Sequence, residues 1–168
     1  MVKRKFWDAA FSSKVGDRGE HDTPADMVHD LAQVFEWDMD VCASRPNVCE
    51  MFYSIAHDGL ETGWFGLCWM NPPYGRQIGK WVLKARAVSR NEGTAVVCLL
   101  PSRTDTKWWQ GNIPFASQVV FIKGRLKFGA SSNSAPFPSA FVVFGDLSVL
   151  QRLKLARYGW SIEGGRMS

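Results

Sequence analysis

The residues best placed for chemistry are Asn71, Pro72, Pro73 and Tyr74, which directly follow an apolar run at 64–70. The two prolines have no backbone N–H, so the segment presents hydrogen-bond acceptors without competing donors. Asn71 precedes a proline and is driven toward an extended backbone, which lets its side-chain oxygen and the Pro72 carbonyl converge. Tyr74 adds an aromatic face beside them. The segment is therefore suited to hold an amino group on a flat heterocycle.

Hydrophobic periodicity predicts the elements that position this segment. Segments with apolar residues at helical spacing predict helices at about residues 23–36, 76–90 and 147–158. Apolar runs predict strands at 37–42, 64–70, 94–100, 119–122 and 141–144. The first helix is expected to have Thr23 as its N-cap, Pro24 in its first position and Asp26 near a capping-box acid. A small, polar loop is expected at 129–139. This alternation of helices and strands predicts a three-layer α/β fold.

Length and composition favour one folded domain. The chain has 168 residues, of which 46% are hydrophobic, including eight Trp, so a single core is expected. Residues 1–20 are predicted to be a loosely ordered arm, and residues 21–168 the domain. No apolar stretch is long enough to span a membrane, and no signal peptide is visible, so we expect a cytoplasmic protein.

The cysteines and histidines do not form a metal pattern. The four cysteines lie in apolar surroundings without a Cys-x-x-Cys pair, and the three histidines are scattered. We therefore expect buried, reduced thiols and no metal.

Charge is distributed unevenly along the chain. Residues 1–75 carry 6 Lys and Arg against 12 Asp and Glu, whereas residues 76–168 carry 14 against 4. The basic second half is typical of a protein with a polyanionic partner, although solvated surface charge alone could produce some of this imbalance.

The segment at 71–74 resembles the Asn-Pro-Pro-Tyr signature of S-adenosylmethionine-dependent amino methyltransferases, most closely the DNA N6-adenine enzymes. Further segments in the same order match the small, phage-type DNA adenine methyltransferase (Dam-like) family, so the resemblance covers about residues 23–145. They are the Thr-Pro pair at 23–24, the acidic segment at 38–43, and the segments at 99–109, 123–125 and 138–141. The resemblance implies a single-domain Rossmann-like methyltransferase fold, with a mixed, mostly parallel sheet flanked by helices.

The resemblance also implies roles for individual residues. Asn71 and Pro72 would accept hydrogen bonds from the amino group of a flipped adenine, beside Pro73, and Tyr74 would stack on the base. S-Adenosylmethionine would be the cofactor, with its site formed by Thr23, Pro24, Asp40, Asp58 and Asn71.

Some of these cofactor roles have structural alternatives. Thr23 and Pro24 could only begin a helix, and Asp40 and Asp58 could only cap turns. The chain lacks the glycine-rich loop that most enzymes of this class have after the first strand. The segment from Asp38 to Ser44 either replaces that loop or is the acidic segment that binds the ribose.

Basic residues beyond the signature are predicted to bind double-stranded DNA. Arg76, Lys80 and Lys84 recur at i, i+4 and i+8 on the helix at 76–90, where like charges weaken an isolated helix and a phosphate would relieve the repulsion. The remaining members of this set are Arg103, Lys107, Arg125 and Lys127.

The sequence thus predicts transfer of a methyl group from S-adenosylmethionine to N6 of adenine in DNA. Two alternatives remain open at this point. One is methylation of another amino group, such as cytosine N4, an RNA base or a protein glutamine. The other is a methyltransferase-like DNA-binding protein that has lost its cofactor. The sequence gives neither the recognised DNA site nor the oligomeric state.

Overall fold

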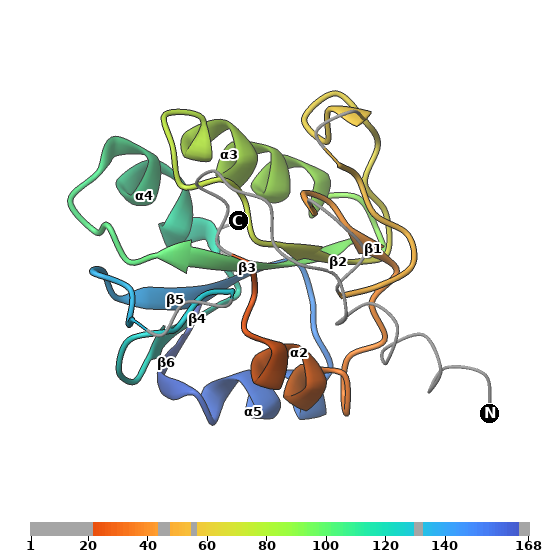
Figure 1. Cartoon of the computed structure of the whole chain (residues 1–168). Helices are drawn as coiled ribbons and strands as arrows, with labels where there is room; N and C mark the ends of the chain where they lie inside the picture. The colour runs from red at the N-terminus through yellow and green to blue at the C-terminus, as the bar shows by residue number, and fades with distance from the viewer. Residues whose placement is uncertain (1–21, 44–47, 55–56, 130–132, 165–168) are drawn as a thin grey trace.

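A computed structural model describes residues 22–43, 48–54, 57–129 and 133–164, which form one sheet with helices on both faces (Figure 1). The predicted arm at residues 1–20 lies outside the described residues. The sheet has six strands in the order β1-β2-β3-β5-β4-β6. Their bounds are β1 Met39–Asp40, β2 Leu67–Met70, β3 Ala95–Pro101, β4 Gln118–Ile122, β5 Ser139–Phe144 and β6 Gly159–Glu163.

The helices form two layers (Figure 1). On one face of the sheet lie α3 (Ile78–Val88) and α4 (Lys107–Asn112), the latter continued by a 3-10 turn at Ile113–Phe115, and on the other face lie α2 (Ala25–Leu31) and α5 (Val149–Ala156). The predicted three-layer α/β arrangement is therefore confirmed.

The strand pairing differs from the expected mostly parallel sheet. β1, β2 and β3 pair in parallel, whereas β5 is antiparallel to both β3 and β4, and β6 is antiparallel to β4. Helix α3 carries the chain from β2 back to the start of β3, as parallel neighbours require. No described helix joins β4 to β5, and the chain returns directly, which makes that pair antiparallel. The sheet is consequently mixed, with β1 to β4 all running in one direction.

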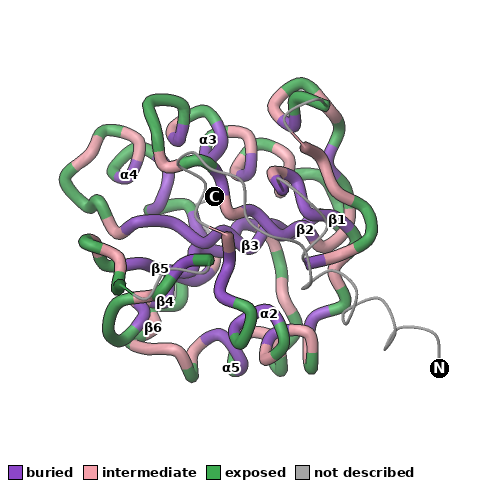
Figure 2. Tube along the Cα trace, viewed as in Figure 1, coloured by how far each residue is buried: buried purple, intermediate pink, exposed green. Residues whose placement is uncertain are grey.

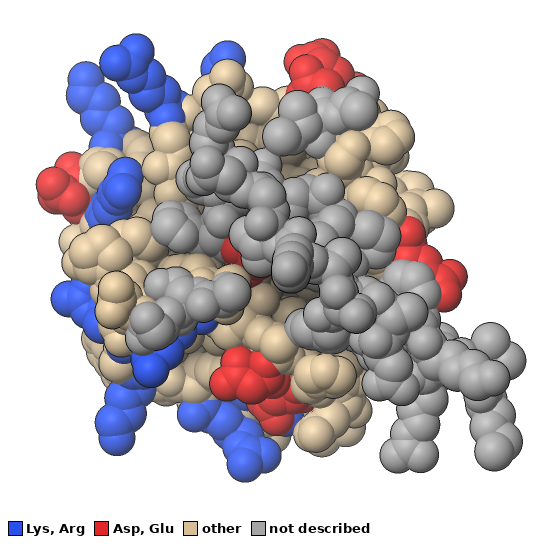
Figure 3. Space-filling view, viewed as in Figure 1, with Lys and Arg blue, Asp and Glu red and all other residues tan. Residues whose placement is uncertain are grey.

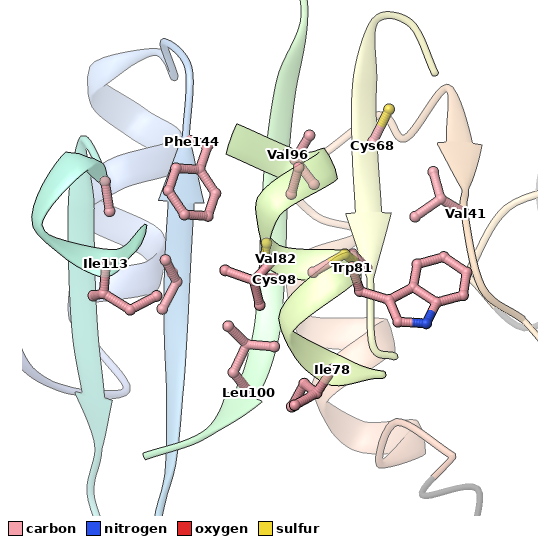
Figure 4. Close-up of a cluster of buried hydrophobic side chains, with 14 of the residues drawn as sticks. Val41, Cys68, Ile78, Trp81, Val82, Val96, Cys98, Leu100, Ile113 and Phe144 are labelled. Carbon is pink, nitrogen blue, oxygen red and sulfur yellow. The ribbon is translucent and has the colours of Figure 1, made fainter. Parts of the chain in front are cut away.

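A hydrophobic core lies on each side of the sheet (Figure 2). Figure 4 shows Ile78 and Val82 of α3 directed toward β3. The Trp81 side chain extends toward Val41, the residue that follows β1. On the opposite face, Leu31 of α2 and Leu155 of α5 are buried in the second cluster. The apolar spacing of α3 predicted its buried face correctly.

The first helix is shorter than predicted, and its capping differs. Its N-cap is Pro24, with φ −53° and ψ 134°, and no side chain caps it, so Thr23 is not the cap. The helix ends at Leu31 rather than near Glu36 because the chain turns at residues 32–34.

Two predicted strands are also shorter, and one strand was not predicted. β2 begins at Leu67 because Gly66 adopts φ +65° against Asp38, whose carboxylate accepts a hydrogen bond from the Leu67 N–H at 2.7 Å. The segment expected at 37–42 forms only the two residues of β1. β6 was missed because its two large apolar side chains are exposed at the edge of the sheet.

Candidate active site

The carboxyl ends of four strands define one edge of the sheet. Because β1, β2, β3 and β4 run in the same direction, the segments that follow Asp40, Met70, Pro101 and Ile122 all leave from this edge. Ligands of open α/β sheets bind outside the carboxyl ends of parallel strands. The fold therefore brings the segment at 71–74 together with most of the predicted site residues.

A chain of hydrogen bonds fixes Asn71 at this edge. Its amide nitrogen donates to the Thr23 hydroxyl at 3.1 Å, and its amide oxygen accepts from the Tyr74 hydroxyl at 3.0 Å. The Tyr74 hydroxyl also lies 3.1 Å from the Leu99 carbonyl of β3. Thr23 thus contacts the predicted catalytic segment directly, although 48 residues separate it from Asn71.

The Tyr74 ring is packed among aromatic side chains. Phe128 and Phe137 make T-shaped contacts with it, with ring centroids at 5.9 and 5.5 Å. Burial raises the pKa of the Tyr74 hydroxyl, which keeps it protonated and able to donate. A base that stacks on Tyr74 would therefore have to displace or share these contacts, which the sequence did not indicate.

A cavity of about 720 Å³ opens on the α3 side of the segment at 71–74. Pro73 and Asp58 border it, together with the α3 residues Lys80, Trp81 and Lys84. Its size falls within the range of small-molecule sites, roughly 300 to 1,000 Å³. Pro73 therefore faces this cavity, while the side chains of Asn71 and Tyr74 bond toward Thr23 and β3.

Lys84 holds the wall of the cavity in place. Its ammonium group donates to the carbonyls of Gly59 at 3.0 Å and Leu60 at 2.7 Å, and also to that of Thr62. It lies 4.9 Å from the centre of the Trp64 ring. Desolvation lowers the pKa of Lys84. Lys84 was predicted to bind a DNA phosphate, but in the structure its ammonium group donates to backbone carbonyls instead.

The wall of the cavity at residues 58–62 includes two positions, Asp58 and Gly59, whose backbone geometry restricts which residues can occupy them. Asp58 adopts φ +42°, and its carboxylate accepts from the Leu60 N–H at 3.3 Å. A Cβ on Gly59 would lie 2.2 Å from the Val41 carbonyl oxygen and 2.9 Å from the Trp81 ring. Asp58 therefore caps a turn, as one sequence interpretation expects, and it also borders the cavity. Its cofactor role stays a prediction.

Asp40 lies at the end of β1 and is almost fully buried. Its carboxylate accepts a hydrogen bond from the Cys42 N–H at 3.3 Å. Burial, with a smaller contribution from the negative charge of Asp22, raises the pKa of Asp40 from 3.8 to about 7. Val41 and Cys42 border the cavity, whereas Asp40 lies behind them.

The other basic residues surround the same edge of the sheet. Arg76 and Lys80 are exposed and border the cavity, although Arg76 precedes α3 instead of lying on it. Arg103 and Lys107 follow β3, and Arg125 and Lys127 follow β4; all four are exposed. Figure 3 shows most of the visible Lys and Arg along the left, upper left and lower margins of the molecule, whereas Asp and Glu are scattered at the top, left, right and lower centre.

Several expectations concern sites elsewhere in the chain. Cys68 and Cys98 are buried thiols as predicted, whereas Cys42 and Cys49 are half-buried. Within the described ranges, no three His, Cys, Asp or Glu residues are arranged to hold a metal ion. None of the helices in these ranges is long and apolar enough to cross a membrane.

The sequence reasoning missed three contributors to the site: the clamp formed by Lys84, and the aromatic contacts of Phe128 and Phe137. Phe128 directly precedes the small, polar loop at 129–139 and Phe137 lies near its end, and large apolar residues at such positions were the available signal. The clamp consists of the hydrogen bonds from the Lys84 ammonium to the backbone carbonyls of Gly59 and Leu60. The sequence could not indicate it, because these carbonyls lie more than 20 residues away and every residue has one.

A mixed α/β sheet with a cavity at the carboxyl ends of its parallel strands is typical of enzymes that bind nucleoside-like molecules. Residues 12–152 match the family described as DNA N-6-adenine-methyltransferase (Dam). A DNA N-6-adenine-methyltransferase of Haemophilus phage HP1 (strain HP1c1) is 30% identical over 143 residues, which cover 79% of this chain and 82% of the relative. No solved structure is significantly similar to the chain.

The chain therefore belongs to the DNA N-6-adenine-methyltransferase family and is a DNA adenine methyltransferase. The resemblance expected from the segment at 71–74 and its neighbours is confirmed at the level of the family.

Proposed function

We propose that the chain uses S-adenosylmethionine to methylate N6 of an adenine flipped out of double-stranded DNA, in the cytoplasm of a bacterial or phage-infected cell. The observation that carries this proposal is the position of Asn71. It is fixed at the carboxyl edge of the sheet by Thr23 and Tyr74, next to a cavity of about 720 Å³.

The cavity is suited to S-adenosylmethionine. Its lining combines the Asp58 carboxylate with the apolar surface of Trp81 and Pro73, a set of groups that fits a cofactor with polar and apolar parts. Asp58 would accept from the adenine amino group of the cofactor. Asp40 is the candidate acceptor for its ribose, a role that requires the segment at 41–42 to move aside, because Asp40 lies behind it. Thr23 and Pro24 would lie near its methionine end. The bound cofactor supplies an activated methyl group, so the protein needs to align the reactants and requires no nucleophile of its own.

The segment at 71–74 offers acceptors for the amino group of the target base. The Pro72 carbonyl accepts no hydrogen bond from any described residue, and both prolines lack an N–H. The Asn71 oxygen would be the second acceptor, in exchange for or in addition to its bond from Tyr74. Two acceptors on the amino hydrogens favour the pyramidal nitrogen that can attack the methyl group, and Tyr74 would stack on the base.

The basic residues at the same edge support a DNA duplex as substrate. Arg76 and Lys80 border the cavity, while Arg103, Lys107, Arg125 and Lys127 follow strands that end at this edge. These cations would bind phosphates on either side of the flipped adenine, because an atom inside the stack cannot be reached. Lys84 would act indirectly, through the wall that it holds.

A Rossmann-like methyltransferase fold accounts for this arrangement. The parallel strands β1, β2 and β3, with the cavity outside their carboxyl ends, support this assignment. In such a fold, β5 is an antiparallel strand inserted between the parallel strands β3 and β4.

The test is methyl transfer to duplex DNA from S-adenosylmethionine labelled in its methyl group, followed by analysis of the nucleosides. The wild-type chain should produce N6-methyladenine. The Asn71→Ala variant should lose about 100- to 1,000-fold in rate, the effect of removing one preorganised hydrogen-bonding group from a reaction centre. Calorimetric titration with S-adenosylmethionine should show that this variant still binds the cofactor.

Other outcomes would point to the alternatives. Label in cytosine, RNA or a protein glutamine would contradict the assignment of N6-adenine. DNA binding without any heat of S-adenosylmethionine binding would identify a DNA-binding protein without cofactor. Wild-type turnover by Asn71→Ala would contradict the role of Asn71.

A further inference from the structure

β6 is an edge strand whose outer side is available for pairing. It pairs with β4 on its inner side, with Gln118 opposite Glu163 and Ile122 opposite Gly159. The Gly164 N–H donates to Ser117 and the Lys123 N–H donates to Tyr158. Because antiparallel pairing alternates, the N–H and C=O groups of Gly159, Ser161 and Glu163 point away from β4. No described residue bonds to these outward groups.

The side chains on this edge are unusual for an unpaired strand. Trp160 is 69% exposed and Ile162 is 43% exposed. The Trp160 ring stacks on Phe121 with centroids 5.6 Å apart, which fixes it on one face of the strand. Ile162 borders an apolar hollow between Trp109 and Phe121. Proteins commonly protect an edge strand with lysine, proline or a bulge, and residues 159–163 contain none of these protections.

A second copy of the same strand complements this edge. If two β6 strands pair antiparallel about Ser161, the outward groups of Ser161 bond to those of the other Ser161. Gly159 then pairs with Glu163 of the second copy. In the same register Trp160 lies opposite Ile162 of the second copy on one face, which joins the exposed apolar side chains across the axis.

The charges at the ends of the strand also complement each other. Glu163 forms an ion pair with Arg152 of its own chain at 3.4 Å, and its side chain remains 57% exposed. Pairing Gly159 with Glu163 of the second copy brings that carboxylate toward the exposed Arg157, two residues before Gly159. Each Glu163 would thus lie between two arginines, and the two-fold axis repeats the arrangement.

We infer that β6 is a dimerisation edge, at which two copies of this chain join their six-stranded sheets about a two-fold axis at Ser161. β6 lies beyond residue 152, where the family match ends, so the inference rests on this chain's own residues. β1 and β2 lie at the opposite end of the strand order, far from the axis. The dimer therefore leaves Asn71 accessible in each copy, and methyl transfer per chain should not depend on it.

The test is the molecular mass of the full chain by analytical ultracentrifugation across the micromolar range. The wild-type chain should sediment as a dimer of twice the 18.9 kDa chain mass. Ser161→Pro removes an outward N–H and leaves the backbone groups that pair with β4, although it also removes the hydroxyl that accepts from Gln118 at 3.1 Å. Ile162→Lys places a charge on the edge and keeps that hydroxyl. Each variant should raise the dimer Kd by about thirtyfold or more, the effect of losing an interface hot spot.

A matched control is Leu150→Lys, which places the same charge on a side chain of α5 that is 72% exposed and does not belong to the edge strand. This variant should remain dimeric. Hydrogen exchange adds a test of register: the amides of Gly159, Ser161 and Glu163 should be protected in the wild-type dimer and exchange quickly in Ile162→Lys. A monomeric wild type, or both edge variants remaining dimeric, would overturn the inference. Because methylation is measured separately, failure of this inference and failure of the proposed function are distinguishable.

Discussion

Asp40 gives the sharpest prediction about stability. Only 3% of its surface is exposed, and burial raises its pKa from 3.8 to about 7. The unfolded chain would release this proton at the ordinary pKa, near 3.8, whereas the folded chain keeps it until about pH 7. Between these values the folded state binds more protons, so the free energy of unfolding should fall as the pH rises.

The size of the effect follows from the shift. Each pKa unit corresponds to about 1.4 kcal/mol, so the shift of Asp40 corresponds to at most about 4 kcal/mol of unfolding free energy. This contribution is fully present below the unfolded pKa and is lost by about pH 7. Asp40→Asn keeps the shape of the side chain and cannot ionise, so the variant should lack this part of the pH dependence.

The assay is urea unfolding of both chains from about pH 4.5 to about pH 8. Stability of the wild type relative to Asp40→Asn should decrease steadily over this range and then level off. Asp105→Asn removes an exposed carboxylate and serves as the control for loss of one negative charge. If the curves of the wild type and Asp40→Asn run parallel within about 0.5 kcal/mol, burial does not control the ionisation of Asp40, and the reasoning fails.

Two further predictions concern lysines that bond within the fold. Lys84→Met should reduce the unfolding free energy by about 1.5 to 3 kcal/mol, the contribution of hydrogen bonds from a charged donor. It should also weaken S-adenosylmethionine binding in calorimetry, whereas Lys80→Met should leave stability unchanged; equal stability of the two variants would exclude the clamp. Lys154→Met should cost about 1 to 3 kcal/mol in urea unfolding, because the buried Lys154 bonds to Asp30 at 2.5 Å and so ties α5 to α2. Lys123→Met, which removes an exposed lysine from another segment, is the control, and an equal loss would argue against the contact with Asp30.

Local sequence patterns were sufficient for the main elements of the fold. The runs at 95–100, 119–122 and 141–144 become buried strands, because only a position covered on both faces tolerates continuous apolar residues. The spacing of Ile78, Trp81 and Val82 predicts the buried face of α3 for a similar reason. Strand direction was not determined this way, because apolar content records burial and not the partner of a strand. β6 was missed because its exposed residues carry no burial signal.

The sequence by itself determined the family and singled out the segment at 71–74 as the candidate catalytic segment, because adjacent residues and their order along the chain carry both. Only the tertiary structure decided how that segment is held. The bond between Thr23 and Asn71 joins residues 48 positions apart, and the acceptors of Lys84 are carbonyls, which every residue possesses. Such contacts depend on how the helices pack on the sheet. A backbone carbonyl can accept a hydrogen bond at any residue type, so the sequence does not show which carbonyls will do so. The family and its candidate site residues could therefore be predicted from the sequence, whereas the contacts that hold these residues were decided by packing.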